Sequence, residues 1–276
     1  MFITLKSIAI FLITNTYMLL FGLTESYTMQ QMVPLNFFYK LIPYQIVLLI
    51  KNYMLMSIIE FGTNNKPNIT ENNADLKEEY KGEFLINFFR SVCVETFTLL
   101  LIQKYYFEFP IMDFNILYEF LWFLPLSFIF ELVFDFFHYW AHRIIHSNSR
   151  LYKYIHKKHH KFSHPIPIIT YYQEPLDLIL TNSIPTILTL CVIPKITYFQ
   201  YTMIFLYKIF IEISGHCGKK LYPVGSFLQF MWLPKYLNIQ LYTEDHDAHH
   251  SINNCNYSKR FSLWDKVFGT YRSRII

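Results

Sequence analysis

Histidines are the residues of this chain whose type and spacing could carry chemistry. All 11 of them, in a chain of 276 residues, lie between His138 and His250. Imidazole is the commonest side-chain ligand of metals and binds them in its neutral form. The clustering therefore predicts a metal site in the second half of the chain.

Nine of these histidines form three groups whose spacing places each group on one face of a helix. The first group has the spacing i, i+4, i+8, and the other two have the spacing i, i+3, i+4. At least eight candidate ligands predict more metal than one zinc ion, which takes three or four. Nitrogen ligands favour iron, zinc or copper. The groups are His138, His142 and His146, then His156, His159 and His160, then His246, His249 and His250.

Acidic residues beside these groups have two interpretations. A carboxylate that accepts a hydrogen bond from an imidazole fixes its tautomer and orients it toward a metal. Asp245 and Asp247 could instead cap the last helix. The candidate acceptors are Asp135, Glu244, Asp245 and Asp247.

The composition indicates a membrane protein. Hydrophobic residues make up 53% of the chain and charged residues only 16%, whereas soluble domains are about one-quarter charged. A helix needs about 20 apolar residues to cross a bilayer. Segments of this kind are 3–23, 41–61, 84–103, 115–137 and 176–213, the last long enough for two helices that turn near Pro194 and Lys195.

Two other features of the N-terminal region complete this topology. The polar stretch 62–83 is expected to form a loop. The segment 3–23 could be a cleaved signal peptide, but its apolar core is longer than usual and no small-residue cleavage site follows. We therefore expect it to be a retained anchor.

Basic residues predict the orientation of the histidines. The segments 138–164 and 214–276 contain 14 of the 24 Lys and Arg residues. Basic loops stay in the cytosol, so both segments are expected to face it, and the charge of +4 favours anionic lipid headgroups. No nucleic-acid-binding module is present, and the four dispersed cysteines indicate neither a disulfide framework nor a thiolate metal site.

The order of the histidine motifs resembles that of the fatty acid hydroxylase superfamily. HRIIH (142–146), HKKHH (156–160) and HDAHH (246–250) follow one another, with apolar spans before the first and between the second and third. The stretches YKYIHKKHHKF, SGH (214–216) and NCNYSKRFSLWDKVFGT (254–270) are similar to the same family of membrane di-iron oxygenases. It includes sterol desaturases, methylsterol oxidases and cholesterol 25-hydroxylase. The resemblance runs from about residue 134 to residue 270.

This resemblance implies a set of metal ligands. His138 is expected to lie behind the ligands or near the substrate, and His164 to be a surface residue or to lie behind the ligands. The implied ligands are His142, His146, His156, His159, His160, His216, His246, His249 and His250.

One position departs from the family pattern. Sterol-oxidising relatives have a histidine in a Tyr-Ala-His-Pro run, where this chain has Tyr172, Gln173, Glu174 and Pro175. Glu174 could ligate iron through oxygen, as carboxylates do in soluble di-iron bundles. Alternatively a ligand is missing and activity is altered or lost.

The fold class that follows is all-α. Integral membrane helices would carry a cytosolic, histidine-rich helical cap that holds a dinuclear metal site. Residues 1–110 would anchor the protein in the membrane, and residues 111–276 would form the catalytic domain.

The function that the resemblance implies is O2-dependent oxidation of a lipid, most simply hydroxylation of a sterol. The cofactors would be two iron ions, and the electrons would come from NAD(P)H through cytochrome b5 and its reductase. Lysines on the cytosolic face would suit an acidic redox partner or equally the membrane surface. The expected location is the endoplasmic reticulum membrane. These lysines are Lys153, Lys157, Lys158, Lys161, Lys219 and Lys220.

Three alternatives remain open at this point. A desaturase of the same family would use the same iron site. A membrane zinc hydrolase would be active without oxygen. A catalytically impaired scaffold, suggested by Glu174, would bind lipid or metal without turnover.

Overall fold

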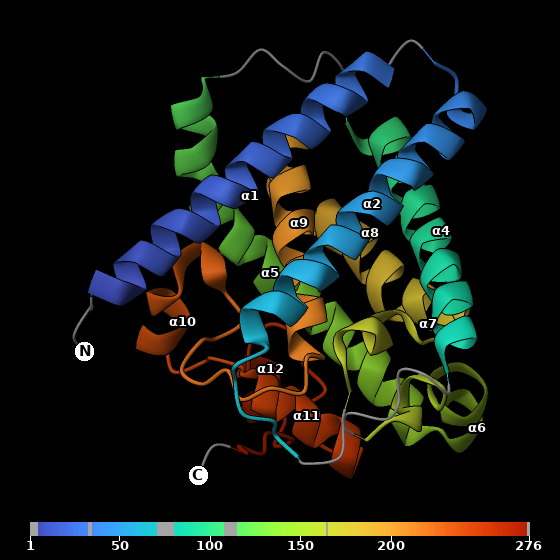
Figure 1. The fold of residues 1–276 in the computed structure, drawn as a ribbon, viewed down its shortest axis with the longest axis vertical. Coiled ribbons are helices and arrows are strands. Elements are labelled where there is room, and N and C mark those ends of the chain that lie inside the picture. The colour runs from blue at the N-terminus through green and yellow to red at the C-terminus, as the bar shows by residue number, and fades with distance from the viewer. Residues whose placement is uncertain (1–4, 33–34, 71–79, 108–114, 164, 275–276) are drawn as a thin grey trace.

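The long apolar segments of the sequence form the helices that build most of the molecule (Figure 1). The computed structural model describes residues 5–32, 35–70, 80–107, 115–163 and 165–274, and within these ranges it contains helices and two isolated β-bridges but no strand. The all-α prediction is therefore confirmed. The principal helices are α1 (Leu5–Met32), α2 (Phe37–Thr63), α4 (Lys81–Tyr106), α5 (Ile116–Ser147), α8 (Ile184–Val192) and α9 (Tyr198–Gly215).

Four helices among the described residues are long and apolar enough to cross a membrane. They are α2, α4, α5 and the continuous helical segment Pro175–Val192. This last segment joins α7 (Pro175–Leu178), the π-helical η4 (Ile179–Ser183) and α8. The chain then turns through residues 193–197 into α9, as the sequence predicts for 176–213. Because α1 is not among the four, a crossing at 3–23 stays a prediction.

Helix α9 lies at the centre of the bundle, with α1, α2 and α5 packed against it. A capping box at Thr197 and Gln200 begins the helix. Gly22 of α1 allows a close approach, because a Cβ atom there would collide with Met203 of α9. The helix ends at His216, so the packing of the bundle determines where this histidine lies.

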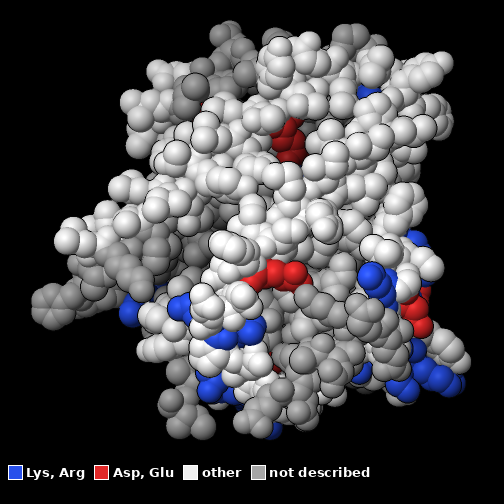
Figure 2. All heavy atoms as spheres, in the orientation of Figure 1, with Lys and Arg blue, Asp and Glu red and all other residues white. Residues whose placement is uncertain are grey.

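Short helices and loops form a cap at one end of the bundle. Helix α5 runs from the bundle into this cap and carries its last histidines there. Figure 2 shows Lys and Arg gathered at this end, whereas the face over α1 and α2 is almost free of charge. The other elements of the cap are α6 (Ser149–Leu151), η1 (Tyr152–His156), η2 (His159–Lys161), η3 (Pro167–Tyr171), η5 (Leu228–Phe230), α10 (Trp232–Tyr236), α11 (Thr243–Ile252) and α12 (Leu263–Val267).

Candidate metal centre

Nine histidines converge in the cap as two adjacent groups. In each group the ligand nitrogen atoms all lie within 4.8 Å of one another. Together the two groups contain the nine histidines that the sequence predicts as ligands. The first histidine group is His142, His146, His156, His160 and His249, and the second histidine group is His159, His216, His246 and His250.

Residues four apart along the chain share a group, because they lie on the same face of a helical turn. In HKKHH, His156 ends the π-helical η1 and His160 lies in the 3-10 helix η2, and both belong to the first group. His159 belongs to the second group. The motif HDAHH is divided in the same way, with its middle histidine, His249, in the first group. Each of these two motifs therefore contributes to both groups.

Nitrogen–nitrogen distances within the groups fit metal coordination. In the first group, Nε2 of His156 lies 2.9 Å from Nε2 of His142 and 3.0 Å from Nε2 of His160. In the second, Nε2 of His216 lies 3.3 Å from His159 and 3.1 Å from His246. Two nitrogen atoms bound about 2.1 Å from one metal ion, at angles between octahedral and tetrahedral, are about 2.9 to 3.4 Å apart.

Hydrogen bonds at Nδ1 of His142 and of His249 show that Nε2 of each ring carries a lone pair. Nδ1 of His142 donates to the carbonyl oxygen of Tyr257 at 2.9 Å, and Nδ1 of His249 donates to that of Cys255 at 2.7 Å. In the neutral imidazole the proton is then on Nδ1 and Nε2 is an acceptor. Facing lone pairs repel unless a cation lies between them, so the donor set fits a metal ion in each group.

Two further imidazoles have free nitrogens inside the groups. Nε2 of His146 and Nε2 of His250 are buried and have no hydrogen-bond partner in the described part of the chain. An unpaired buried polar atom is costly, and a bound metal ion would satisfy it. That these nine histidines bind metal stays a prediction, and the geometry is compatible with it.

Burial keeps the rings of His216 and His249 neutral. It lowers the pKa of His249 to about 3 and the pKa of His216 to about 4. Both pKa values lie well below neutral pH, so each ring presents a lone pair rather than a second N–H. These two histidines are thus in the protonation state that metal binding needs.

Asp177 is a functional candidate that the sequence interpretation missed. Its fully buried carboxylate accepts a hydrogen bond from Nδ1 of His156 at 2.7 Å. This contact is the ion pair between a carboxylate and a histidine that the described residues show. The signal available in the sequence was an acidic residue just after Pro175, within an otherwise apolar segment.

The acidic residues proposed as imidazole acceptors have other partners in the structure. Asp135 accepts hydrogen bonds from the backbone N–H groups of Lys259, Arg260 and Phe261 at 2.6 to 3.0 Å. It therefore holds the C-terminal segment against α5 and does not orient a ring.

In α11 the capping interpretation applies to Asp245, which accepts from the backbone N–H of Tyr242 at the start of the helix. Asp247 pairs with Arg274. Glu244 accepts from the backbone N–H of Tyr222. The imidazoles of His142 and His249 donate instead to backbone carbonyl oxygens, and not to these three carboxylates.

Glu174 lies outside both histidine groups, contrary to its proposed role as an iron ligand. Its carboxylate pairs with Lys158 at 2.9 Å and with Arg90 at 3.4 Å, and its side chain is 35% exposed. Lys158 binds one of its carboxylate oxygens and Arg90 binds the other. Neither oxygen is therefore directed at a histidine group.

Replacement of Glu174 by glutamine should therefore leave the metal content unchanged. Ion pairs of this exposure contribute about 0 to 1 kcal/mol, so we expect only a small decrease in the unfolding temperature in detergent. Iron per chain and the melting temperature of the purified variant test both expectations. A loss of iron in the variant would instead indicate that Glu174 is a metal ligand.

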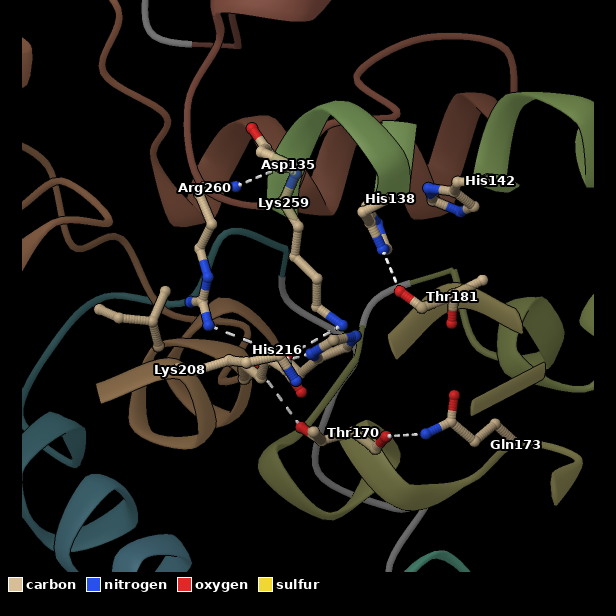
Figure 3. A network of polar contacts seen from close by, with 12 residues as sticks. Asp135, His138, His142, Thr170, Gln173, Thr181, Lys208, His216, Lys259 and Arg260 are labelled. Carbon is tan, nitrogen blue, oxygen red and sulfur yellow. Dashed lines mark hydrogen bonds and ion pairs between the residues drawn. The ribbon is translucent and has the colours of Figure 1, made fainter. Parts of the chain in front are cut away.

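Of the two other histidines, only His138 lies in the described part of the chain, and it belongs to neither group. Nδ1 of His138 donates to the carbonyl oxygen of Thr181 at 2.7 Å (Figure 3). Its ring lies 5.1 Å from that of His142, and a role behind the ligands stays a prediction. His164 is outside the described residues.

A cavity of about 340 Å³ reaches the second histidine group, since His216 and His246 form part of its wall. Its volume is in the range of small-molecule sites. Most of the wall is apolar and comes from α2, α9 and the loops before α11, including Ile58, Ile59, Phe210, Leu228 and Leu241. The cavity can therefore bring an apolar molecule to the candidate metal centre.

Comparison with known families gives a match over the part of the chain that contains the histidines. The fatty acid hydroxylase family model matches residues 127–270, just over half of the 276 residues. No solved structure matches the chain.

Curated relatives are similar to about half of the chain. The C-4 methylsterol oxidase of Schizosaccharomyces pombe is 31% identical over 54% of this chain and 47% of its own length. Methylsterol monooxygenase 1 of Rattus norvegicus is 33% identical over 49% of this chain and 43% of its own. Sphinganine C4-monooxygenase 1 of Arabidopsis thaliana is 28% identical over 51% of each. The chain thus spans about half the length of the curated relatives it matches.

Proposed function

Since the chain belongs to the fatty acid hydroxylase family, we propose that it is a membrane-bound di-iron oxygenase that hydroxylates a lipid, with a sterol as the first candidate. The observation that carries the proposal is the division of nine imidazoles into two adjacent groups, each able to hold one metal ion. The names of the methylsterol-oxidising relatives support a sterol. The four apolar helices support a membrane location.

Two iron ions, if bound by these neutral imidazoles, would supply the O2 chemistry, and the protein would supply binding and orientation. In the overall reaction, one oxygen atom enters a C–H bond and the other leaves as water, using two electrons and two protons from a donor. His142 and His249 are held by the backbone carbonyls behind them, and His156 by Asp177. The cavity would exclude water and present the lipid beside His216 and His246.

An external electron donor is part of the proposal. Cytochrome b5 with its NAD(P)H-dependent reductase would deliver electrons at the cap, on the cytosolic face of the endoplasmic reticulum membrane. Support comes from the basic residues at this end of the molecule (Figure 2), since an acidic protein is attracted to a basic surface. Lys153, Lys157, Lys161 and Lys220 are exposed there.

Expression in a sterol-producing yeast under 18O2 tests the oxygenase. We expect lipid extracts to contain a species that has gained one labelled oxygen atom, absent from cells that express the variant with His249→Ala and His250→Ala. Loss of two hydrogens instead would indicate the desaturase. No new lipid, with cytochrome b5 co-expressed and iron present in the purified protein, would refute oxidation of these lipids. Turnover without oxygen and with zinc bound would indicate the hydrolase.

A further inference from the structure

Three cations surround one buried carboxylate beside the second histidine group. Oε1 of Glu212 lies 2.9 Å from Lys208, 3.5 Å from Lys259 and 3.9 Å from Arg260. None of these side chains is more than 15% exposed. Figure 3 shows the side chains of Lys259 and Arg260 extending from the backbone held by Asp135 toward Lys208 and His216.

Donors outnumber acceptors in this cluster. Two other carboxylates lie near it: Glu131, 3.8 Å from Nε of Arg260, and Glu95, which lines a small pocket together with Lys208. The oxygens of Asp135 accept from backbone N–H groups. All three guanidinium nitrogens of Arg260 lack a hydrogen-bond partner among the described residues. Buried cations are stable only when acceptors are present, so the cluster favours a ligand that brings an oxygen atom.

The cavity gives such a ligand access to one of these cations. Of the three, Lys259 lines the cavity, together with Glu212 and the ligand candidates His216 and His246. Within the described residues its ammonium group contacts a single carboxylate, that of Glu212. An ammonium group has three N–H donors, which leaves Lys259 able to donate to a molecule in the cavity.

Building on the proposed oxygenase function, we propose that Lys259 donates a hydrogen bond to an oxygen atom of the lipid, and that the substrate carries this oxygen close to the carbon that is oxidised. The 3-hydroxyl of a sterol that enters with its ring A first would provide such an atom. A sterol that entered with its alkyl tail first would present no acceptor. Lys259 would thereby select both the substrate class and its direction of entry.

Binding of two sterols that differ by one oxygen atom tests the proposal. Tritiated cholesterol is bound to the full chain in nanodiscs and is displaced by unlabelled cholesterol or by cholest-5-ene, which lacks the 3-hydroxyl. Hydrogen bonds to charged groups contribute more than neutral ones, so we expect cholesterol to bind about 10- to 100-fold more tightly. Lys259→Met should reduce this preference to about twofold or less, and Lys259→Arg should retain most of it.

The matched control is Lys235→Met, which removes an exposed lysine in α10 that does not line the cavity. Equal affinity of the two sterols for the unaltered chain would overturn the proposal, as would a preference that survives in Lys259→Met. Iron per chain is measured in every sample. Missing iron in the unaltered protein would refute the di-iron function, whereas the ratio of the two affinities would still decide the role of Lys259.

Discussion

Replacement of His249 by alanine should remove one iron ion per chain and abolish lipid oxidation. His249 is fully buried in the first histidine group, and its Nε2 lies 3.1 Å from Nε2 of His160. Loss of residues that only orient a ligand typically lowers metal affinity 10- to 100-fold, so loss of a ligand itself should exceed that range. We expect iron per chain to fall from two to about one.

The two-group geometry makes this prediction more specific than a general loss of activity. His216→Ala should remove the other iron, because His216 belongs to the second group. His138→Asn is the control, since His138 is buried and close to the site but belongs to neither group. Elemental analysis of the purified proteins provides the measurement. Two irons in both His249→Ala and His216→Ala would contradict the assignment of these residues as ligands.

The histidine pattern was predictable because it depends on local geometry. Imidazoles four residues apart lie on one helical face whatever the rest of the fold does. The division of HKKHH and of HDAHH between two groups was not predictable, because it depends on which other histidines the tertiary fold brings against each of them. The sequence pattern therefore indicated the members of the site but not their partition.

The polar partners of the histidines were harder to predict, for two physical reasons. Backbone carbonyls such as those of Tyr257 and Cys255 exist at every residue, so no side-chain pattern reveals them. Asp135 was proposed because it lies one turn before His138. Its carboxylate instead binds backbone groups more than 120 residues away, which only the tertiary fold brings near.

Glu174 and Asp177 show how tertiary packing reverses an expectation based on position. Glu174 stands where the family resemblance led us to expect a histidine, but Lys158 and Arg90 pair with it. Asp177 is three residues further on, where the first turn of α7 directs it into the protein and against His156. The carboxylate that contacts a histidine of the candidate metal centre is thus the one at 177.

Replacement of Asp177 by alanine should accordingly lower metal affinity about 10- to 100-fold. The variant loses the acceptor that holds His156 through Nδ1, and it leaves that buried N–H without a partner. Asp177→Asn, which keeps an acceptor oxygen but not the negative charge, should give an intermediate loss. The affinity is measured by titrating iron into the metal-free protein and following the occupancy of the first histidine group.

The matched comparison for Asp177→Ala is Glu174→Gln, which alters the other acidic residue beside Pro175. If Asp177 acts through His156, combining Asp177→Ala with His156→Ala should cost no more affinity than His156→Ala alone. Two changes that act through one contact are not additive, whereas independent changes add. Additive losses, or unchanged iron binding in Asp177→Ala, would show that the carboxylate serves only the packing of α7. A non-additive loss would assign Asp177 as the residue that orients His156 toward the metal.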